Sequence, residues 1–441
     1  MRGADVPPGA QPSDFVLQTS PARSGLDPAR TVLETGVVVL AKPTRTTPAV
    51  AINLAMRAGS IADPPGLPGI TWLLSRVIDR GTATRSAADI ADELDSRGIT
   101  LTITVTRHLL SLVCTCLADD FEAVLALLGE MLMSPSLPER EIATRKGEVI
   151  TAIRQDEDNP AVRATETLMA LLYPDGHPYG RRTKGSIEIV ESLTREQLLR
   201  LHADRFAPTG LTAVVVGDAE PARVKEVAAR VFGGWRKPAP SSIALPPVRP
   251  ATARRRVVIP MMNKAQADIA YGFTTITRRD SAYYACWLMN VALGQYAIGG
   301  RLGDSIRERQ GMAYYVSSSL DANVAEGPLL VRAGVSPLNV DRAVASIDEE
   351  VARLVRDGLS EKELDESRRY LIGSIPRALE TNAAIASFLQ TEEFFGLGLD
   401  YDARLPDLLG AVTLDDVNAA ARRALDPDRA AIVIAGPYAD V

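Results

Sequence analysis

The sequence predicts an α+β fold of two tandem homologous domains, each a mostly antiparallel sheet with helices packed on one face. Length supports two domains, because 441 residues are too many for one ordinary hydrophobic core. An internal repeat supports their homology. Within each half, strand-like runs cluster beside paired helical runs, which is typical of α+β rather than parallel α/β proteins.

The internal repeat relates residues 192–218 to residues 412–437. In both copies a Thr opens a helix, an x-Pro turn follows, and a Val/Ile-rich strand ends at Gly. Three equivalent pairs are 219 residues apart: Thr194 with Thr413, Pro208 with Pro427, and Gly217 with Gly436. A further pair, Leu137 and Leu359, is 222 residues apart. Because the repeat unit is half the chain, the pattern indicates a duplicated domain and not a solenoid.

Apolar alternation and helical periodicity locate the elements of each half. The strands are expected at residues 37–43, 48–60 and 100–117 (split by a turn), and in the second half at 267–275 and 327–335. The long helices are expected at Phe121–Met133, Glu139–Asp156, Val340–Asp357 and Glu361–Asn382.

A proline-rich stretch separates the two halves. Five prolines without helical or strand periodicity indicate an extended, semi-stiff linker at residues 236–256. This divides the chain into an N-terminal arm (1–30), an N-terminal domain (31–235), the linker, and a C-terminal domain (257–441).

Composition and charge exclude several classes of protein. Forty-nine basic against fifty-five acidic residues give a net charge of −6 with no basic stripe, which argues against nucleic-acid binding. No run of eighteen apolar residues is present, so no membrane span is expected. Three cysteines, Cys114, Cys116 and Cys286, fit a reducing compartment better than a disulfide framework. We therefore expect a cytoplasmic protein, with a periplasmic location as the alternative if a leader has been removed.

Two long segments carry a family resemblance. Residues 36–82 contain the run "GSIADPPGLPGITWLLSRVIDRGT" at their end, and residues 177–218 begin with "HPYGRRTKGSIEIVESLT". From about Leu33 to the C-terminus the chain resembles the pitrilysin/insulinase zinc peptidases, the inverzincins. The resemblance implies that the two domains form half of a clam-shell. It also implies a helix that, in catalytic members, carries the zinc motif H-x-x-E-H.

The zinc-binding residues of that motif are missing here. By resemblance, Trp72 takes the place of the first His, Ser75 of the Glu, and Arg76 of the second His, while Ala152 takes the place of a third ligand, a Glu. Indole and guanidinium groups donate hydrogen bonds and offer zinc no lone pair. We therefore expect no metal and no other cofactor in this chain.

The second half retains a different pair of functional residues. Arg307 and Tyr314 stand seven positions apart in "RERQGMAY", matching the R-E-x-x-G-x-A-Y pattern of active relatives. The resemblance implies that they bind the substrate carbonyl and the oxyanion in a neighbouring zinc site. Gly299 and Gly300 resemble a glycine-bearing loop that handles substrate in noncatalytic subunits of mitochondrial processing-type peptidases.

Together these residues predict a noncatalytic, zinc-free subunit of a heteromeric zinc peptidase. A sister subunit with intact H-x-x-E-H would hold the zinc, and peptides would be the substrates. Two alternatives stay open: a structural scaffold subunit without proteolytic role, and a stand-alone peptide-binding clamp.

Overall fold

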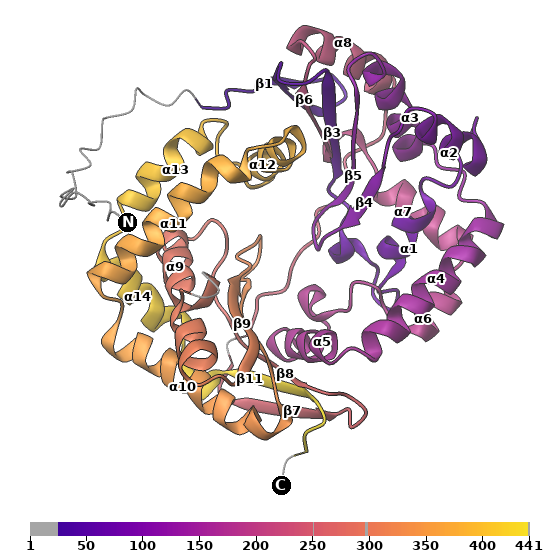
Figure 1. The fold of residues 1–441 in the computed structure, drawn as a ribbon. Coiled ribbons are helices and arrows are strands. Elements are labelled where there is room, and N and C mark those ends of the chain that lie inside the picture. The colour runs from indigo at the N-terminus through magenta and orange to yellow at the C-terminus, as the bar shows by residue number, and fades with distance from the viewer. Residues whose placement is uncertain (1–24, 250, 296–298, 440–441) are drawn as a thin grey trace, which may run out of the picture.

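The computed structural model describes residues 25–249, 251–295 and 299–439, as two halves joined by a strap (residues 236–249; Figure 1). The N-terminal half contains β1 (Ala29–Val32), β2 (Val38–Pro43), β3 (Ala49–Met56), α1 (Ile70–Val77), α2 (Ala87–Asp95), β4 (Thr102–Val105), β5 (Leu110–Leu117), α3 (Phe121–Met133), α4 (Glu139–Glu157), α5 (Pro160–Leu172), α6 (Ile187–Ser192), α7 (Arg195–Arg205), β6 (Leu211–Gly217) and α8 (Pro221–Phe232). The C-terminal half contains β7 (Arg255–Pro260), β8 (Ala267–Thr274), α9 (Tyr283–Asn290), β9 (Ala313–Leu320), β10 (Pro328–Val335), α10 (Val340–Asp357), α11 (Glu361–Ala378), α12 (Asn382–Phe395), α13 (Tyr401–Gly410), α14 (Leu414–Ala424) and β11 (Ala431–Gly436).

The two sheets share one topology. The C-terminal sheet has the strand order β7-β11-β8-β10-β9, and the N-terminal sheet has the equivalent order β2-β6-β3-β5-β4, with β1 added beyond β2. Neighbouring strands are antiparallel except for one pair in each sheet, β2 with β6 and β7 with β11. Equivalent strands thus have equivalent partners, which confirms the prediction of two homologous α+β halves.

A glycine ends the last strand of each half. Gly217 ends β6 and Gly436 ends β11, and both have φ of +144°. A Cβ on Gly217 would lie 2.2 Å from the carbonyl oxygen of Ala49, and one on Gly436 would lie 2.6 Å from Cα of Ala267. A side chain would force the neighbouring strand away, which explains why both copies of the repeat have glycine here.

Each sheet is covered on one face by helices of its own half and on the other face by a helix of the opposite half (Figure 1). Helix α5 packs on β8 and β11, where Leu168 lies in one cluster with Ala270 and Val433. Helix α12 packs on β3 and β6, where Leu389 lies in one cluster with Val214. The helical layer predicted for one face is present. The exchange of α5 and α12 between the halves goes beyond the sequence prediction.

Polar contacts attach α12 to the N-terminal half. Arg30 donates two hydrogen bonds of 2.9 Å to the carboxylate of Glu393. At the other end of the helix, the Thr44 hydroxyl lies 2.9 Å from Oδ1 of Asn382. The sequence predicted a single helix from Glu361 to Asn382, but α11 ends at Ala378 and Thr381 caps the start of α12. The prediction was wrong there because a cap residue interrupts an otherwise continuous helical pattern.

The boundaries of the linker and the arm differ slightly from the sequence prediction. The strap forms no helix or strand, as an extended linker should. Strand β7 begins at Arg255 and pairs with β11, so the last two residues of the predicted linker lie in the sheet. Most of the predicted arm, residues 1–30, lies outside the described residues, and β1 starts at Ala29.

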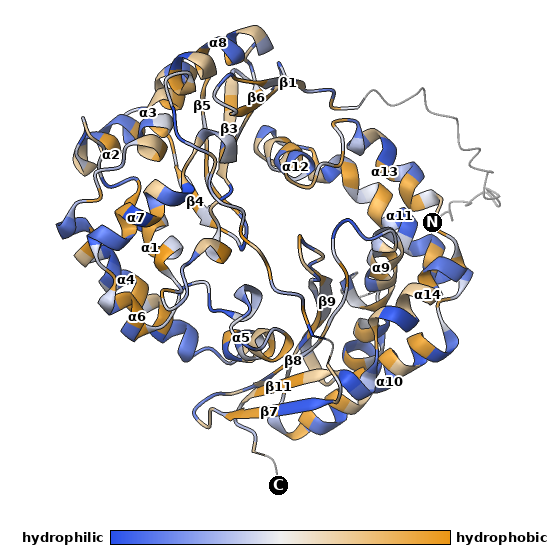
Figure 2. Cartoon of the chain, turned by 180° about the vertical axis from the view of Figure 1, so that it is seen from behind, coloured by the Kyte–Doolittle hydropathy of each residue, from blue (hydrophilic) through white to orange (hydrophobic). Residues whose placement is uncertain are grey.

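The outer helices are amphipathic, as Figure 2 shows for α10 and α14, which carry both hydrophilic and hydrophobic residues. In α10 the buried positions include Val344, Ile347, Val351 and Leu354, which follow helical spacing. In the part of the chain that the structure describes, none of the helices combines the length and apolar character needed to cross a bilayer.

A buried carboxyl group on α12 makes the fold sensitive to alkaline pH. Glu392 is 1% exposed, and among the described residues neither of its carboxylate oxygens has a hydrogen-bond partner. Burial, together with the nearby Asp402 carboxylate, raises the pKa of Glu392 from 4.5 to about 8. At a pH between these two pKa values, the Glu392 carboxyl group loses its proton in the unfolded chain and keeps it in the folded chain. Stability therefore falls as pH rises, by up to about 4–5 kcal/mol from this group.

We expect Glu392→Gln to remove this dependence. Thermal unfolding of the variant and the wild type should differ little at pH 5, and the variant should be more stable at pH 9. The neighbouring Glu393→Gln, which alters a partly exposed ion pair with Arg30, is the matched control and should leave the alkaline loss in place. Parallel melting temperatures of wild type and Glu392→Gln from pH 5 to pH 9 would contradict this assignment.

Candidate functional site

Helix α1, which carries three of the predicted site positions, is held by a buried aspartate. The Asp63 carboxylate accepts hydrogen bonds from the backbone N–H groups of Gly69 (2.7 Å) and Thr71 (3.0 Å) at the start of the helix. Burial raises the pKa of Asp63 to about 6, while these two bonds and Arg181 act in the opposite direction. The run "ADPPGLPG" is therefore a structural frame that fixes where α1 begins.

Gly69 lets the chain enter α1 against a neighbouring segment. Its φ is +96°, and a Cβ would lie 2.4 Å from the carbonyl oxygen of Lys184. We expect Gly69→Ala to lower the free energy of unfolding by about 2 kcal/mol or more, because both the backbone conformation and the space oppose a side chain.

The control for this substitution is a glycine in the middle of a helix. Gly147 lies in α4, is exposed, and would find no atom within 4 Å of an added Cβ. Gly147→Ala should raise stability by up to about 1 kcal/mol, because Ala is the better helix former. Urea unfolding of both variants measures whether the free energy of unfolding falls for Gly69→Ala and rises for Gly147→Ala. A Gly69→Ala variant as stable as the wild type would contradict the role given to this turn.

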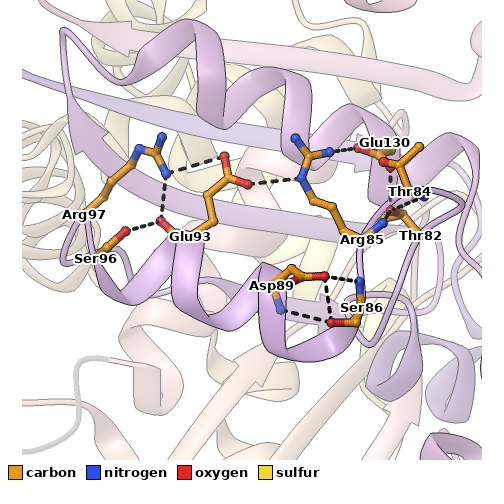
Figure 3. Close-up of polar contacts among 9 residues, drawn as sticks. All are labelled: Thr82, Thr84, Arg85, Ser86, Asp89, Glu93, Ser96, Arg97 and Glu130. Carbon is orange, nitrogen blue, oxygen red and sulfur yellow. Dashed lines mark hydrogen bonds and ion pairs between the residues drawn. The ribbon is translucent and has the colours of Figure 1, made fainter.

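A polar network fixes the segment that leaves α1 (Figure 3). The hydroxyls of Thr82 and Thr84 donate to Glu130 on α3, and Thr82 does so at 2.5 Å. Arg85 binds the same carboxylate and also pairs with Glu93 on α2 at 3.1 Å. The segments before and after α1 are thus both attached to their surroundings, which limits the movement of the helix between them.

The structure brings Trp72 and Arg76 together on α1. The Arg76 guanidinium lies over the Trp72 ring, 4.6 Å from its centroid, and the Lys184 ammonium lies 5.7 Å from the same centroid. Ser75 is buried, and its hydroxyl donates to the Trp72 carbonyl oxygen at 2.7 Å. Ala152 lies half-buried on α4, which packs against α1. The four predicted positions therefore occupy two contacting helices.

These residues do not fit a zinc ion. Zinc in proteins is bound by Cys sulfur, His nitrogen or carboxylate oxygen, and Trp72, Arg76 and Ala152 provide none of these. The Ser75 hydroxyl is turned toward the backbone, and two cationic groups stack on the indole. Across the described residues, no group of three or more His, Cys, Asp and Glu side chains is placed to hold a metal.

The three histidines are buried and serve the fold. Nε2 of His108 lies 2.6 Å from the Tyr179 hydroxyl, that of His177 lies 3.1 Å from a backbone oxygen of the strap, and that of His202 lies 2.8 Å from the Leu132 carbonyl oxygen. Burial lowers the pKa of His108 and of His202 to about 4. Both rings are therefore neutral at pH 7, and each has a hydrogen-bond partner within the protein.

The predicted catalytic pair lies at the edge of the other sheet. Arg307 belongs to a π-helical segment, Gly303–Arg309, and its side chain is 45% exposed. Tyr314 lies near the start of β9, the edge strand, and is 68% exposed. Gly311, with φ of +61°, makes the turn between these two elements. The segment packs beside β9, so the structure presents both side chains from adjoining elements.

A cross-strand hydrogen bond fixes the strand that carries Tyr314. Tyr315, Gly334 and Asp268 form one row across β9, β10 and β8. The Tyr315 hydroxyl donates to the buried Asp268 carboxylate at 2.5 Å. A Cβ on Gly334 would lie 2.4 Å from the Tyr315 ring, so only glycine lets the ring cross β10. Sequence reasoning missed this row, although a glycine inside the strand pattern "GPLLVRAGV" was a signal for close approach.

The predicted glycine loop is only partly described. Gly299 is exposed and Gly300 is buried, where a Cβ would lie 2.9 Å from Cα of Gly294. Both line a cavity of about 200 Å³ beside Arg301, whose guanidinium pairs with Glu363 at 2.6 Å. Close packing accounts for Gly300, and its role in handling substrate stays a prediction.

Two family models match the chain. The model described as Insulinase (Peptidase family M16) matches residues 38–183, and the one described as Peptidase M16 inactive domain matches residues 192–371. Together they span well over half of the sequence.

Individual proteins agree with these matches. An uncharacterized zinc protease of Streptomyces coelicolor is 25% identical over 93% of this chain and 90% of its own length. A protein of Helicobacter pylori named a non-peptidase homolog is 22% identical over 83% of this chain and 84% of its own length. A crystal structure described as a peptidase M16 inactive domain from Pseudomonas fluorescens is 26% identical. It has a TM-score of 0.86 and covers 93% of this chain and 98% of that chain.

A duplicated α+β chain that keeps the frame of a zinc-peptidase helix without its metal ligands defines a peptidase-like protein. The chain belongs to peptidase family M16, the insulinase family, which confirms the resemblance drawn from its sequence.

Proposed function

We propose that this chain is the noncatalytic, zinc-free subunit of a heteromeric zinc metallopeptidase. It contributes Arg307 and Tyr314 to the active site of a sister subunit that holds zinc with an intact H-x-x-E-H motif. One observation carries the proposal: the chain combines a helix frame without metal ligands with an exposed Arg–Tyr pair. The frame alone has no donor for zinc, whereas the pair is suited to binding a substrate in another chain.

The chemistry of the pair supports this role. Hydrolysis of a peptide bond places negative charge on the carbonyl oxygen, and preorganised donors aimed at that oxygen lower the barrier. A guanidinium brings a permanent positive charge and several N–H donors, and a phenol brings one O–H donor. Because β9 is fixed through Tyr315 and Asp268, the Tyr314 side chain starts from a rigid strand.

Mixing tests the proposal. The purified chain and its zinc-bearing sister should each cleave an unstructured peptide poorly, and the mixture should cleave it at a rate that saturates at one chain per sister. A sister subunit that is fully active alone, and unchanged by addition of this chain, would overturn the proposal.

A scaffold or peptide-binding subunit without proteolytic role is the second candidate. The H. pylori relative named a non-peptidase homolog supports it. The two candidates differ in one result: a scaffold assembles with its partner without changing the rate of peptide cleavage.

The proposal places the assembly in the cytoplasm. Cys114, Cys116 and Cys286 are free and buried, and burial raises the pKa of Cys114 and Cys286 to about 12 and that of Cys116 to about 11. Thiols in this state behave as small apolar side chains, and a reducing compartment keeps them so.

A further inference from the structure

A pocket of about 270 Å³ lies where the two halves and the strap meet. The N-terminal half contributes Arg57, His108 and Arg205, and the C-terminal half contributes Val324 and Phe394. Its remaining lining residues are Ile61 and five residues of the strap, Pro240, Ser241, Ser242, Ile243 and Leu245. The pocket is slightly smaller than typical small-molecule sites, so it has room for the end of a chain and not for a large ligand.

Two arginines without acidic partners face this pocket. The Arg57 guanidinium lies over the Phe394 ring, 5.2 Å from its centroid. Arg205 donates to the Ser241 carbonyl oxygen at 2.9 Å. Among the described residues neither guanidinium forms an ion pair, and no Asp or Glu lines the pocket. By contrast Arg107, at the same joint, is paired with Asp321 at 2.6 Å.

The remaining polar groups of the pocket add little charge. His108 is buried and bonded to Tyr179, and its lowered pKa keeps it neutral at pH 7. The Ser241 and Ser242 side chains, together with the backbone of the strap, provide neutral donors and acceptors. The net field inside the pocket is therefore positive, and its source is Arg57 and Arg205.

Apolar groups form the rest of the wall. Ile61, Ile243, Leu245, Val324 and Phe394 enclose the space beside the two guanidinium groups. A ligand that matches both the guanidinium groups and the apolar wall needs a carboxylate with an apolar group next to it. A guanidinium binds a carboxylate through paired N–H donors. Inorganic phosphate would satisfy the charges but would leave the apolar wall in contact with water.

We propose that this pocket binds the C-terminal residue of a peptide, with its free carboxylate on Arg57 and Arg205 and an apolar side chain against Phe394 and Ile243. The inference rests on peptides being the substrates in the proposed function, and adds a preference for free, apolar C-termini. The ligand would lie beside the strap, whose backbone forms no helix or strand and so offers hydrogen-bonding groups along the peptide.

Binding to the full chain without any sister subunit tests this inference. The probe is a ten-residue Gly/Ser/Ala peptide that ends in Leu and carries a fluorophore at its N-terminus. Fluorescence anisotropy should show that the free acid binds at least about tenfold more tightly than the same peptide with a C-terminal amide. Peptides ending in Leu should also bind more tightly than those ending in Gly, and inorganic phosphate at equal concentration should compete weakly.

Substitutions separate the pocket from the rest of the surface. Arg57→Gln and Arg205→Gln should each weaken binding of the free acid by about tenfold and leave the amide unchanged. Val324→Asp places a negative charge at an exposed position of the wall, so it should also abolish the preference without disturbing the core. Arg230→Gln, an exposed arginine on α8, is the control and should bind like the wild type.

Equal affinity for acid and amide, or full binding by the Arg57→Gln/Arg205→Gln double variant, would overturn the inference. So would phosphate that competes as strongly as the free-acid peptide, because the site would then recognise charge alone. These outcomes are independent of cleavage by the mixed subunits. If the chain binds the free-acid peptide but does not speed peptide cleavage by the sister subunit, the proposed function is wrong. If it speeds cleavage but does not prefer the free acid, the inference about the pocket is wrong.

Discussion

Arg307→Ala or Tyr314→Phe is expected to lower kcat of the two-subunit peptidase by about ten- to a thousandfold. Both side chains are exposed, at 45% for Arg307 and 68% for Tyr314, so their loss should leave the fold intact. Their proposed hydrogen bonds strengthen as negative charge develops on the substrate oxygen. Since such bonds act in the transition state more than in the bound substrate, kcat should fall more than KM rises.

Arg309→Ala provides the matched control for this experiment. Arg309 lies on the same π-helical segment, is 56% exposed, and pairs with Asp304 at 3.0 Å and with the buried Glu350 at 3.8 Å, a carboxylate that Arg353 also binds. Its removal should change kcat by less than about twofold, because Glu350 keeps Arg353 and the pair with Asp304 is exposed. The measurement is steady-state kinetics of each variant mixed with the sister subunit, in which kcat and KM are compared with those of the wild type. If Arg307→Ala and Tyr314→Phe turn over at the rate of Arg309→Ala, the pair has no role in catalysis.

Rebuilding the lost ligands is expected to create a zinc site in the N-terminal half. The triple variant Trp72→His, Arg76→His and Ala152→Glu places two imidazoles one helical turn apart on α1 and a carboxylate on the contacting helix α4. Two His and one Glu with an open position form a common catalytic zinc set. Zinc affinity should rise at least about a thousandfold, to a dissociation constant near or below about 1 µM.

The position of Ser75 separates binding from chemistry in this design. In the family pattern this position holds the Glu that is not a ligand, so adding Ser75→Glu to the triple variant should leave the zinc affinity within about threefold. The double variant Trp72→His/Arg76→His lacks the carboxylate and should bind zinc clearly more weakly. Metal titration with a chromophoric indicator gives the affinities. A folded triple variant that binds no zinc would show that the frame of α1 and α4 no longer has the geometry of the family.

The sequence predicted the features that depend on local patterns or on the internal duplication, namely where helices begin and that the two halves are homologous. Capping residues such as Thr194 and Thr413 fixed equivalent helix starts, and both form capping boxes in the structure. The duplication also predicted two halves of one fold, but the strand order within each sheet came only from the structure. The sequence could not predict that α5 and α12 exchange sheets. Residues such as Leu168 and Leu389 show by spacing that a helix face is buried, but not which sheet buries it.

At the candidate site, too, the sequence predicted the positions of single residues but not the contacts between distant ones. Trp72, Ser75, Arg76 and Ala152 were placed on two helices by resemblance, and the structure puts those helices in contact. The contacts of Arg76 and Lys184 with the indole could not be foreseen, since Lys184 is more than a hundred residues away in the chain. The joint pocket was also missed, because Arg57 follows β3, Arg205 ends α7 and Phe394 lies on α12, so the three residues form no sequence motif.

The zinc content and peptidase activity of the purified wild-type chain test the central claim most directly. After saturation with zinc and removal of free metal, the chain alone should hold less than about 0.1 zinc ions per molecule, because no ligand set remains at α1 and α4. It should also leave an unstructured peptide intact until the sister subunit is added. One tightly held zinc per chain, together with cleavage by the chain alone, would contradict the account.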